Sequence, residues 1–331
     1  MNTILSRRAL LGGALAATAA AALSPLRRAQ AAGVDKISVD FAYYNPPSLV
    51  LKKNGWLEEA LAPSGTKVEW VLSLGSNKAN QFLAANAVQF GSTAGSAALL
   101  ARANGSPIHT VYLYSQPEWT ALVVGKDSPL KKVAELRGKK IAATKGTDPY
   151  FFLLRALKDA GLAQGDVEIV ELQHPDGRQA LERGQVDAWA GLDPHMAASQ
   201  LDAGSRLLYR NRAYCTYGAL NAREDFLRDH PDLVTIVLRQ YERARQVAKN
   251  NVDETIKIVA EASGLEPRVA ALQLRERTSY PNPSPGADYR RALEGVIPIV
   301  RANQLALPTA DLDGALASLP DAAPARAALR V

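Results

Sequence analysis

Three turns rich in small and hydroxyl-bearing residues could each bind an anion. They are Gly75-Ser76-Asn77, Ser92-Thr93-Ala94-Gly95-Ser96 and Lys145-Gly146-Thr147, and each precedes an expected helix. The unpaired N–H groups and the dipole at a helix start favour negative charge, and small residues let an anion approach the backbone. The same hydroxyl groups could instead cap the helices. Both interpretations remain open for each turn.

Aromatic and polar residues near the expected strand ends could complete such a site. Tyr44 and Trp119 follow strands and could cover an organic tail, Gln116 could donate a hydrogen bond, and Asp193 lies just after a strand. Trp189 sits inside a strand and could equally belong to a core. The candidate ligand-binding residues are Tyr44, Asn45, Ser76, Asn77, Ser92, Thr93, Ser96, Gln116, Trp119, Thr147, Trp189 and Asp193.

Catalytic and metal-binding patterns are missing from the sequence. The four histidines show no metal-ligand spacing, and no Gly-x-Ser-x-Gly, Walker or dinucleotide-binding glycine pattern occurs. Cys215 is the only cysteine and has no neighbouring histidine, so a buried structural role is expected rather than nucleophilic chemistry. We expect no bound metal, no cofactor and no enzymatic activity.

Short β-rich runs alternate with amphipathic helical stretches from residue 36 onward, which predicts an α/β protein with mainly parallel sheets. One set of strands is expected at 37–43, 67–72, 87–91 and 108–114, and a second at 140–143, 167–172 and 186–190.

These two sets predict two lobes. The first lobe is assigned to residues 32–120 and 217–319, the second to 121–216, and a loosely ordered tail to 320–331. Two crossing connections, near 119–123 and 215–219, would form a hinge, with a ligand cleft between the lobes.

The N-terminus has the features of an export signal over residues 1–31. Arg7 and Arg8 precede a short apolar stretch, and Ala29-Gln30-Ala31 matches a cleavage site, which favours the twin-arginine route and a periplasmic location. Removing the segment takes away four arginines and lowers the formal charge from +6 to +2. Nucleic acid is therefore not expected as a partner of the mature chain. Membrane insertion is not expected either, because no later stretch of the sequence is apolar for long enough to span a bilayer.

Four stretches carry a resemblance to a known family. They are residues 61–70, Lys126-Asp127-Ser128-Pro129 with Val133 to Ala142, Arg155 to Leu162, and Gly184-Gln185-Val186-Asp187-Ala188-Trp189 with Asp193-Pro194. The chain resembles the nitrate/sulfonate/taurine family of ABC-transporter substrate-binding proteins and is most similar to its aliphatic-sulfonate branch. The resemblance implies a type II periplasmic-binding-protein fold, a small sulfonate or similar organic anion as ligand, an ABC permease with its ATPase as partner, and a monomer.

Two departures from the family pattern concern the ligand. Relatives often carry Thr-Gly and an acid where this chain reads Thr93-Ala94-Gly95-Ser96, and often have Gln where Tyr44 stands. The missing acid removes a counter-charge for an amino group. An amine-free sulfonate is therefore favoured over taurine.

Two other functions are compatible with the same fold. Relatives of this architecture include a desulfinase and a thiamine-pyrimidine synthase, but a desulfinase needs a cysteine in the cleft and works in the cytoplasm. A sensor subunit that reports ligand occupancy to a membrane kinase would share every cleft feature.

Overall fold

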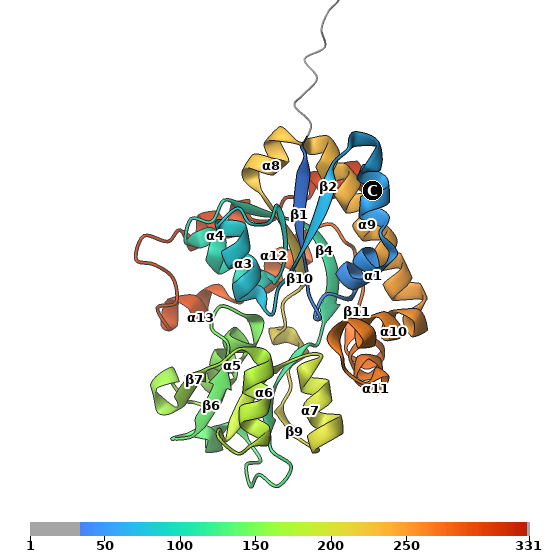
Figure 1. Ribbon diagram of the computed structural model, residues 1–331. Coiled ribbons are helices and arrows are strands. Elements are labelled where there is room, and N and C mark those ends of the chain that lie inside the picture. The colour runs from blue at the N-terminus through green and yellow to red at the C-terminus, as the bar shows by residue number, and fades with distance from the viewer. Residues whose placement is uncertain (1–33, 330–331) are drawn as a thin grey trace, which may run out of the picture. The chain divides into compact units, whose positions relative to one another are not determined.

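The computed structural model describes residues 34–329, so the predicted export signal lies outside the described residues. They form two mixed β-sheets, each with its own helices (Figure 1). The first sheet has the order β11-β4-β10-β3-β1-β2. Its strands are β1 (Lys36–Phe41), β2 (Lys67–Leu72), β3 (Phe90–Ala94), β4 (Ile108–Pro117), β10 (Gly218–Arg223) and β11 (Thr278–Ser279).

The second sheet has the order β7-β6-β8-β5-β9. Its strands are β5 (Thr120–Val124), β6 (Lys140–Ala143), β7 (Glu168–Glu171), β8 (Ala188–Leu192) and β9 (Arg206–Tyr209). The chain leaves the first sheet between β4 and β5 and returns to it at β10. We call the first sheet with α1–α4 and α8–α15 the first lobe, and the second sheet with α5–α7 the second lobe.

The helices fill the connections between strands and make up most of the C-terminal third. They are α1 (Pro46–Asn54), α2 (Trp56–Leu61), α3 (Ser76–Ala84), α4 (Gly95–Ala103), α5 (Asp148–Asp159), α6 (His174–Glu182), α7 (His195–Ala203), α8 (Glu224–Asp229), α9 (Pro231–Asn250), α10 (Val252–Ser263), α11 (Pro267–Ala271), α12 (Ala287–Glu294), α13 (Ile297–Ala302), α14 (Leu312–Ser318) and α15 (Ala323–Leu329). A π-helical turn, Leu272–Glu276, follows α11.

The expectation of mainly parallel sheets was wrong. β1 runs parallel to β2 and β3, and β6 runs parallel to β7 and β8, but β10 is antiparallel to both of its neighbours β3 and β4, and β5 to β8 and β9. The reason is topological. β5 and β10 enter their sheets from the other lobe without the helical crossover that makes successive strands parallel.

The third strand lies three residues later than expected. β3 spans Phe90–Ala94 instead of 87–91, because Asn86 turns the chain with a φ of 54° and the strand then pairs with β1 and β10. Ser92 and Thr93, expected in a turn, therefore lie inside a buried strand. Helix α4 begins at Gly95, directly after it.

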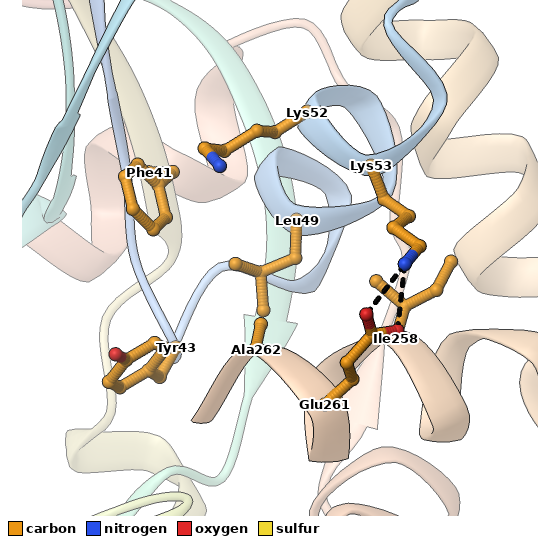
Figure 2. Close-up of a pocket in the computed structure, with 8 residues that line it drawn as sticks. All are labelled: Phe41, Tyr43, Leu49, Lys52, Lys53, Ile258, Glu261 and Ala262. Carbon is orange, nitrogen blue, oxygen red and sulfur yellow. Dashed lines mark hydrogen bonds and ion pairs between the residues drawn. The ribbon is translucent and has the colours of Figure 1, made fainter. Parts of the chain in front are cut away.

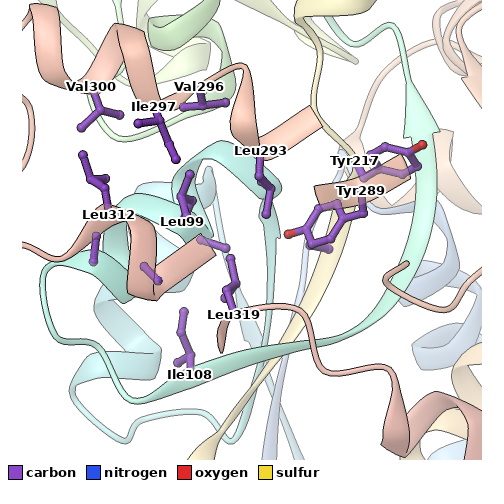
Figure 3. Packing of buried hydrophobic residues seen from close by; sticks show 14 of the residues in the cluster. Leu99, Ile108, Tyr217, Tyr289, Leu293, Val296, Ile297, Val300, Leu312 and Leu319 are labelled. Carbon is purple, nitrogen blue, oxygen red and sulfur yellow. The ribbon is translucent and has the colours of Figure 1, made fainter. Parts of the chain in front are cut away.

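Each lobe has its own apolar core. In the first lobe, α12 and α13 place Leu293, Val296 and Ile297 against Leu99 of α4 (Figure 3). In the second lobe, Trp189 of β8 packs against α6, where a side chain on Gly177 would lie 2.7 Å from the indole nitrogen. Trp189, a candidate ligand residue, is therefore a core residue that needs a glycine beside it.

The C-terminal segment differs from the expected loose tail. Residues 323–329 form α15, which packs along α9 with Ala325 and Ala328 buried, and Arg239 donates to the Ala328 carbonyl oxygen at 3.1 Å. The alanines that made the segment look featureless allow the two helices to approach closely. Across residues 34–329, none of the helices is both long and apolar enough to cross a bilayer.

Candidate functional site

The starts of four helices lie at strand ends that meet between the two lobes. α3 follows β2 and α4 follows β3 in the first lobe, while α5 follows β6 and α6 follows β7 in the second. Two interlobe contacts bring them together. Ser96 of α4 donates to Asp148 of α5, and a methyl group on Gly75, just before α3, would lie 3.2 Å from Nε2 of His174 at the start of α6. The helix starts of both lobes therefore face one another.

Asp148 is held by hydrogen bonds from three separate segments. Its Oδ1 accepts from Ser96 Oγ at 2.6 Å and from Thr216 Oγ1 at 2.8 Å, and its Oδ2 accepts from the Thr216 N–H and from Trp119 Nε1, both at 2.8 Å. Burial raises the pKa of Asp148, and these hydrogen bonds oppose the rise. Because Trp119 and Thr216 belong to the two crossing connections, one carboxylate ties both connections to α4 and α5.

Beside Trp119 lies a narrow hollow that is lined from both lobes. Tyr44 meets Trp119 edge to face, with ring centroids 6.0 Å apart, and Pro46 and Pro117 complete the apolar wall. The polar lining includes Ser115, whose hydroxyl is shielded from solvent and has no partner within the described chain. The hollow thus combines an aromatic wall with polar groups.

A buried ion pair closes one side of this hollow. Arg277 Nη1, after the π-helical turn of the first lobe, lies 3.0 and 3.2 Å from the two carboxylate oxygens of Asp193, after β8 of the second lobe. Burial raises the pKa of Asp193 to about 6 although the arginine opposes the rise. Asp193 also accepts from the Ala197 N–H at 2.9 Å and so caps the first turn of α7. The pair is a fixed polar link between the lobes.

Three of the candidate residues, Asn45, Ser92 and Thr93, form hydrogen bonds to other side chains inside the first lobe. Ser92 Oγ donates to Asp40 at 2.7 Å and accepts from Asn45 Nδ2 at 2.7 Å, and Thr93 Oγ1 accepts from Asn221 Nδ2 at 2.7 Å. All five side chains are fully buried. The hydroxyl groups of Ser92 and Thr93 are thus engaged by the protein, and the expectation of a turn there was wrong because these residues fit a buried strand.

The other candidates lie nearer to the interlobe region. Ser76 Oγ accepts from the Ala94 N–H at 2.9 Å and so links α3 to the end of β3, while Thr147 Oγ1 donates to the Thr144 carbonyl at 2.6 Å. Tyr44 donates to the Ser92 carbonyl and lines the hollow, as Trp119 and Asp193 do. The backbone carbonyl of Gln116 accepts a hydrogen bond from Ser279 Oγ in the strand pair β4–β11. Asn77 lies beside Gly75.

Two charged side chains near this region, Glu118 and Lys145, form ion pairs with other residues of the protein. Glu118 accepts two hydrogen bonds of 2.8 Å from Arg210, and Lys145 lies 3.3 Å from Glu171. Cys215 is buried, and burial raises its thiol pKa well above the ordinary value. The cysteine is therefore poorly suited to act as a nucleophile.

Residues that the sequence did not single out complete this region: Asp148, His174, Thr216, Gln273 and Arg277. Asp148 carried a usable signal, because an acid beside Pro149 after the Lys145-Gly146-Thr147 turn is typical of a first helical turn. No local sequence pattern pointed to Arg277, because its partner Asp193 is 84 residues away in the sequence. Within residues 34–329, no group of three or more His, Cys, Asp or Glu residues is arranged to hold a metal ion.

A second hollow lies outside the interlobe region, between α1 and α10 (Figure 2). It has a volume of about 320 Å³ and opens to solvent. Lys53 bonds both carboxylate oxygens of Glu261, at 2.6 and 2.9 Å, and the Lys52 ammonium lies 4.9 Å from the centre of the Phe41 ring. Its charged groups are exposed and engaged locally, so we assign it no ligand.

The two sheets, their crossing connections and the facing helix starts define a two-lobed periplasmic-binding-protein fold. The family described as NMT1/THI5-like matches residues 44–255, and this chain belongs to it. A Bacillus subtilis relative, named an aliphatic sulfonates-binding protein, is 31% identical over 67% of this chain and 68% of its own length.

Solved structures agree on the architecture. The alkanesulfonate-binding protein SsuA from Xanthomonas axonopodis pv. citri, bound to MOPS, superposes with a TM-score of 0.77 at 25% identity over 86% of this chain and 99% of its own. The desulfurization enzyme DSZB superposes with a TM-score of 0.65 over 89% of this chain and 99% of its own. At 15% identity, that second likeness concerns the fold alone.

Proposed function

We propose that this chain is an exported solute-binding protein that captures a small organic sulfonate between its two lobes and delivers it to an ABC importer. The observation that carries the proposal is the meeting of helix starts from both lobes beside the Tyr44–Trp119 pair. A relative named for aliphatic sulfonates, and a solved relative named for alkanesulfonates, support the same ligand class.

The sulfonate group would be held by backbone N–H groups. Its three oxygens share one negative charge and are bound best by several donors at once. Gly146 and Thr147 precede α5 and offer N–H groups at a helix start, where the dipole adds to the attraction. Gly146 lies opposite Asn77 of α3, because a methyl group added to Gly146 would lie 3.6 Å from the Asn77 Cβ. An anion here would touch both lobes.

Binding would require the lobes to separate and close again. The hollow beside Trp119 does not admit a water-sized sphere in the described arrangement, so a ligand reaches it only when the crossing connections open. A ligand that contacts both lobes favours the closed form by its difference in affinity for the two forms. The permease and ATPase of an importer would then recognise the closed form.

Capture without chemistry fits the site better than catalysis. A desulfinase reaction on this fold would need an accessible thiolate, whereas Cys215 is buried and its pKa is raised. We therefore propose no catalytic role for the chain.

Isothermal titration calorimetry on the chain from Ala32 onward tests the ligand class. Ethanesulfonate should bind and raise the melting temperature, because a ligand of the native state stabilises it by mass action. Sulfate and nitrate, which lack an organic tail for the aromatic wall, should bind at least about tenfold more weakly. No binding by any alkanesulfonate, or sulfite release from one, would contradict the proposal.

A pair of glycine variants tests the location. Gly75→Ala adds a methyl group 3.2 Å from His174 Nε2 across the lobes, whereas Gly125→Ala adds one where no atom lies within 4 Å. The first should obstruct closure and weaken sulfonate binding, while the second should leave the dissociation constant unchanged. Equal affinities for the two variants would place the ligand elsewhere.

A further inference from the structure

Asn77 and His174, from different lobes, each have one unpartnered polar atom beside Gly75. Asn77 Oδ1 on α3 and His174 Nε2 on α6 are shielded from solvent, and neither has a hydrogen-bond partner in the described chain. A methyl group built on Gly75 would lie 2.8 Å from the first atom and 3.2 Å from the second, so the two atoms are no more than 6.0 Å apart. Both atoms therefore lie beside Gly75.

The hydrogen bonds around His174 assign its tautomer. The single hydroxyl proton of Thr144 goes to the Leu172 carbonyl at 2.6 Å, so the 3.3 Å contact between Thr144 Oγ1 and His174 Nδ1 requires Nδ1 to donate. Burial, and to a smaller extent His195, lowers the pKa of His174 to about 3, so the ring is neutral. Nε2 is therefore a bare acceptor.

The region beside Gly75 suits a hydrogen-bond donor. Nε2 of His174 and Oδ1 of Asn77 both accept hydrogen bonds, and leaving buried acceptors without a donor is unfavourable. The start of α5 lies next to it, since a methyl group on Gly146 would be 3.6 Å from Asn77 Cβ. A ligand whose anionic group is held at α5 would meet these acceptors with the next atoms of its tail.

We propose that Asn77 and His174 bind a hydroxyl group on the ligand, so that the site selects a short hydroxyalkanesulfonate. The inference rests on the proposed function. The hydroxyl would donate to His174 Nε2, and the Asn77 amide, turned over about its last bond without change of shape, would donate to the hydroxyl oxygen. One hydroxyl group then satisfies both side chains.

An ammonium group is the weaker fit. It could donate to both acceptors, but removing its charge from water costs more than leaving one acceptor unmet. Lys145, on the turn before α5, is paired with Glu171.

Calorimetry with three matched two-carbon sulfonates tests the inference. The chain from Ala32 onward should bind 2-hydroxyethanesulfonate about tenfold more tightly than ethanesulfonate, because it gains two neutral hydrogen bonds. It should bind 2-aminoethanesulfonate more weakly than the hydroxyl compound. In His174→Phe and Asn77→Leu, which keep the shape and remove the polar atoms, the preference for the hydroxyl compound over ethanesulfonate should shrink to about twofold.

His230→Phe, at the start of α9 and away from the interlobe region, is the matched control and should keep the full preference. Two variants are used so that the result does not depend on the folding of either one. Equal affinity of the wild-type chain for the hydroxyl and unsubstituted compounds would overturn this inference alone. Failure of all three compounds to bind would overturn the proposed function and this inference with it.

Discussion

Ser96 and Asp148 are 52 residues apart in the sequence and lie in different lobes, yet they share a buried hydrogen bond of 2.6 Å. The same carboxylate accepts from Thr216 and Trp119, which precede β10 and β5. The Asp148 side chain therefore occupies a set of donors that resembles an anion-binding site. Because of these contacts, the two lobes and both crossing connections are coupled at the side chain of Asp148.

Substitutions of Asp148 should show whether its charge or its hydrogen bonds contribute more to stability. Asp148→Asn should change the free energy of unfolding by less than about 1 kcal/mol, because the Ser96 and Thr216 hydroxyl groups can rotate to accept from the new amide. Asp148→Leu should cost about 2 to 4 kcal/mol, because it leaves the Thr216 N–H and the Trp119 indole N–H without an acceptor. Urea denaturation measures both, with the exposed Asp159→Asn on the same helix as control. An equal loss for Asn and Leu would show that the charge is what matters.

Burial lowers the pKa of His174 to about 3 and that of His195 to about 4, so both should add stability as the pH rises from about 4 to 7, whereas Asp40 should take stability away over the same window. Burial raises the pKa of Asp40 from 3.8 to about 6, so this carboxyl group binds more protons in the folded protein than in the unfolded chain. The shift corresponds to about 3 kcal/mol. Asp40→Asn should remove that part of the slope in denaturation measured at pH 4, 5, 6 and 7.

Asp193, whose pKa is also raised to about 6, and the two histidines should still contribute to the slope of the Asp40→Asn variant. A slope unchanged by the substitution would show that Asp40 is not protonated in this range.

Ser92→Ala/Thr93→Val should reduce stability more than it reduces affinity. These changes take a donor from Asp40 and an acceptor from both Asn45 and Asn221, all within the first lobe. We expect a loss of about 2 kcal/mol or more in unfolding free energy, with the sulfonate dissociation constant within about threefold of wild type. A tenfold or larger loss of affinity at an unchanged melting temperature would show instead that these hydroxyl groups bind the ligand.

Cys215 should be unreactive in the native protein. Its burial and raised pKa predict that a thiol reagent such as dithionitrobenzoate reacts only after denaturation. Cys215→Ser should keep ligand affinity within about threefold, because no proposed contact uses the sulfur. Rapid labelling of the folded chain would contradict the buried position.

Export should depend on Arg7 and Arg8, which lie outside the described residues. Replacing both with lysine should block the twin-arginine route and leave precursor in the cytoplasm. Cell fractionation with an antibody to the chain measures the outcome. Normal export of the double variant would assign the general secretory route instead.

The sequence was most informative where local patterns decide the structure. β2 and β6 have the predicted bounds, because strands between clear turn residues are marked by their own composition. β3 was displaced because Ser92 and Thr93, typical of turns, are accommodated in a strand by buried partners from β1 and β10. Local propensity carries no information about those partners.

The candidate site shows the same division. The small and hydroxyl residues of the sequence were enough to locate the turns that precede helices. They did not indicate which side chains of these turns form hydrogen bonds within the protein. The Thr216–Asp148 contact joins residues 68 positions apart, and its geometry follows from the packing of two lobes. A single sequence therefore indicates the helix starts and leaves the closing contacts undetermined.

The lone, inaccessible sulfur of Cys215 makes this chain a ready scaffold for a fluorescent reporter. No native cysteine has to be removed before a second one is introduced at an exposed position such as Lys145, beside the start of α5. A dye attached there would sit at the rim where the lobes meet, and its emission would follow their motion without background labelling. The buried thiol thus offers an optical readout of ligand capture in real time.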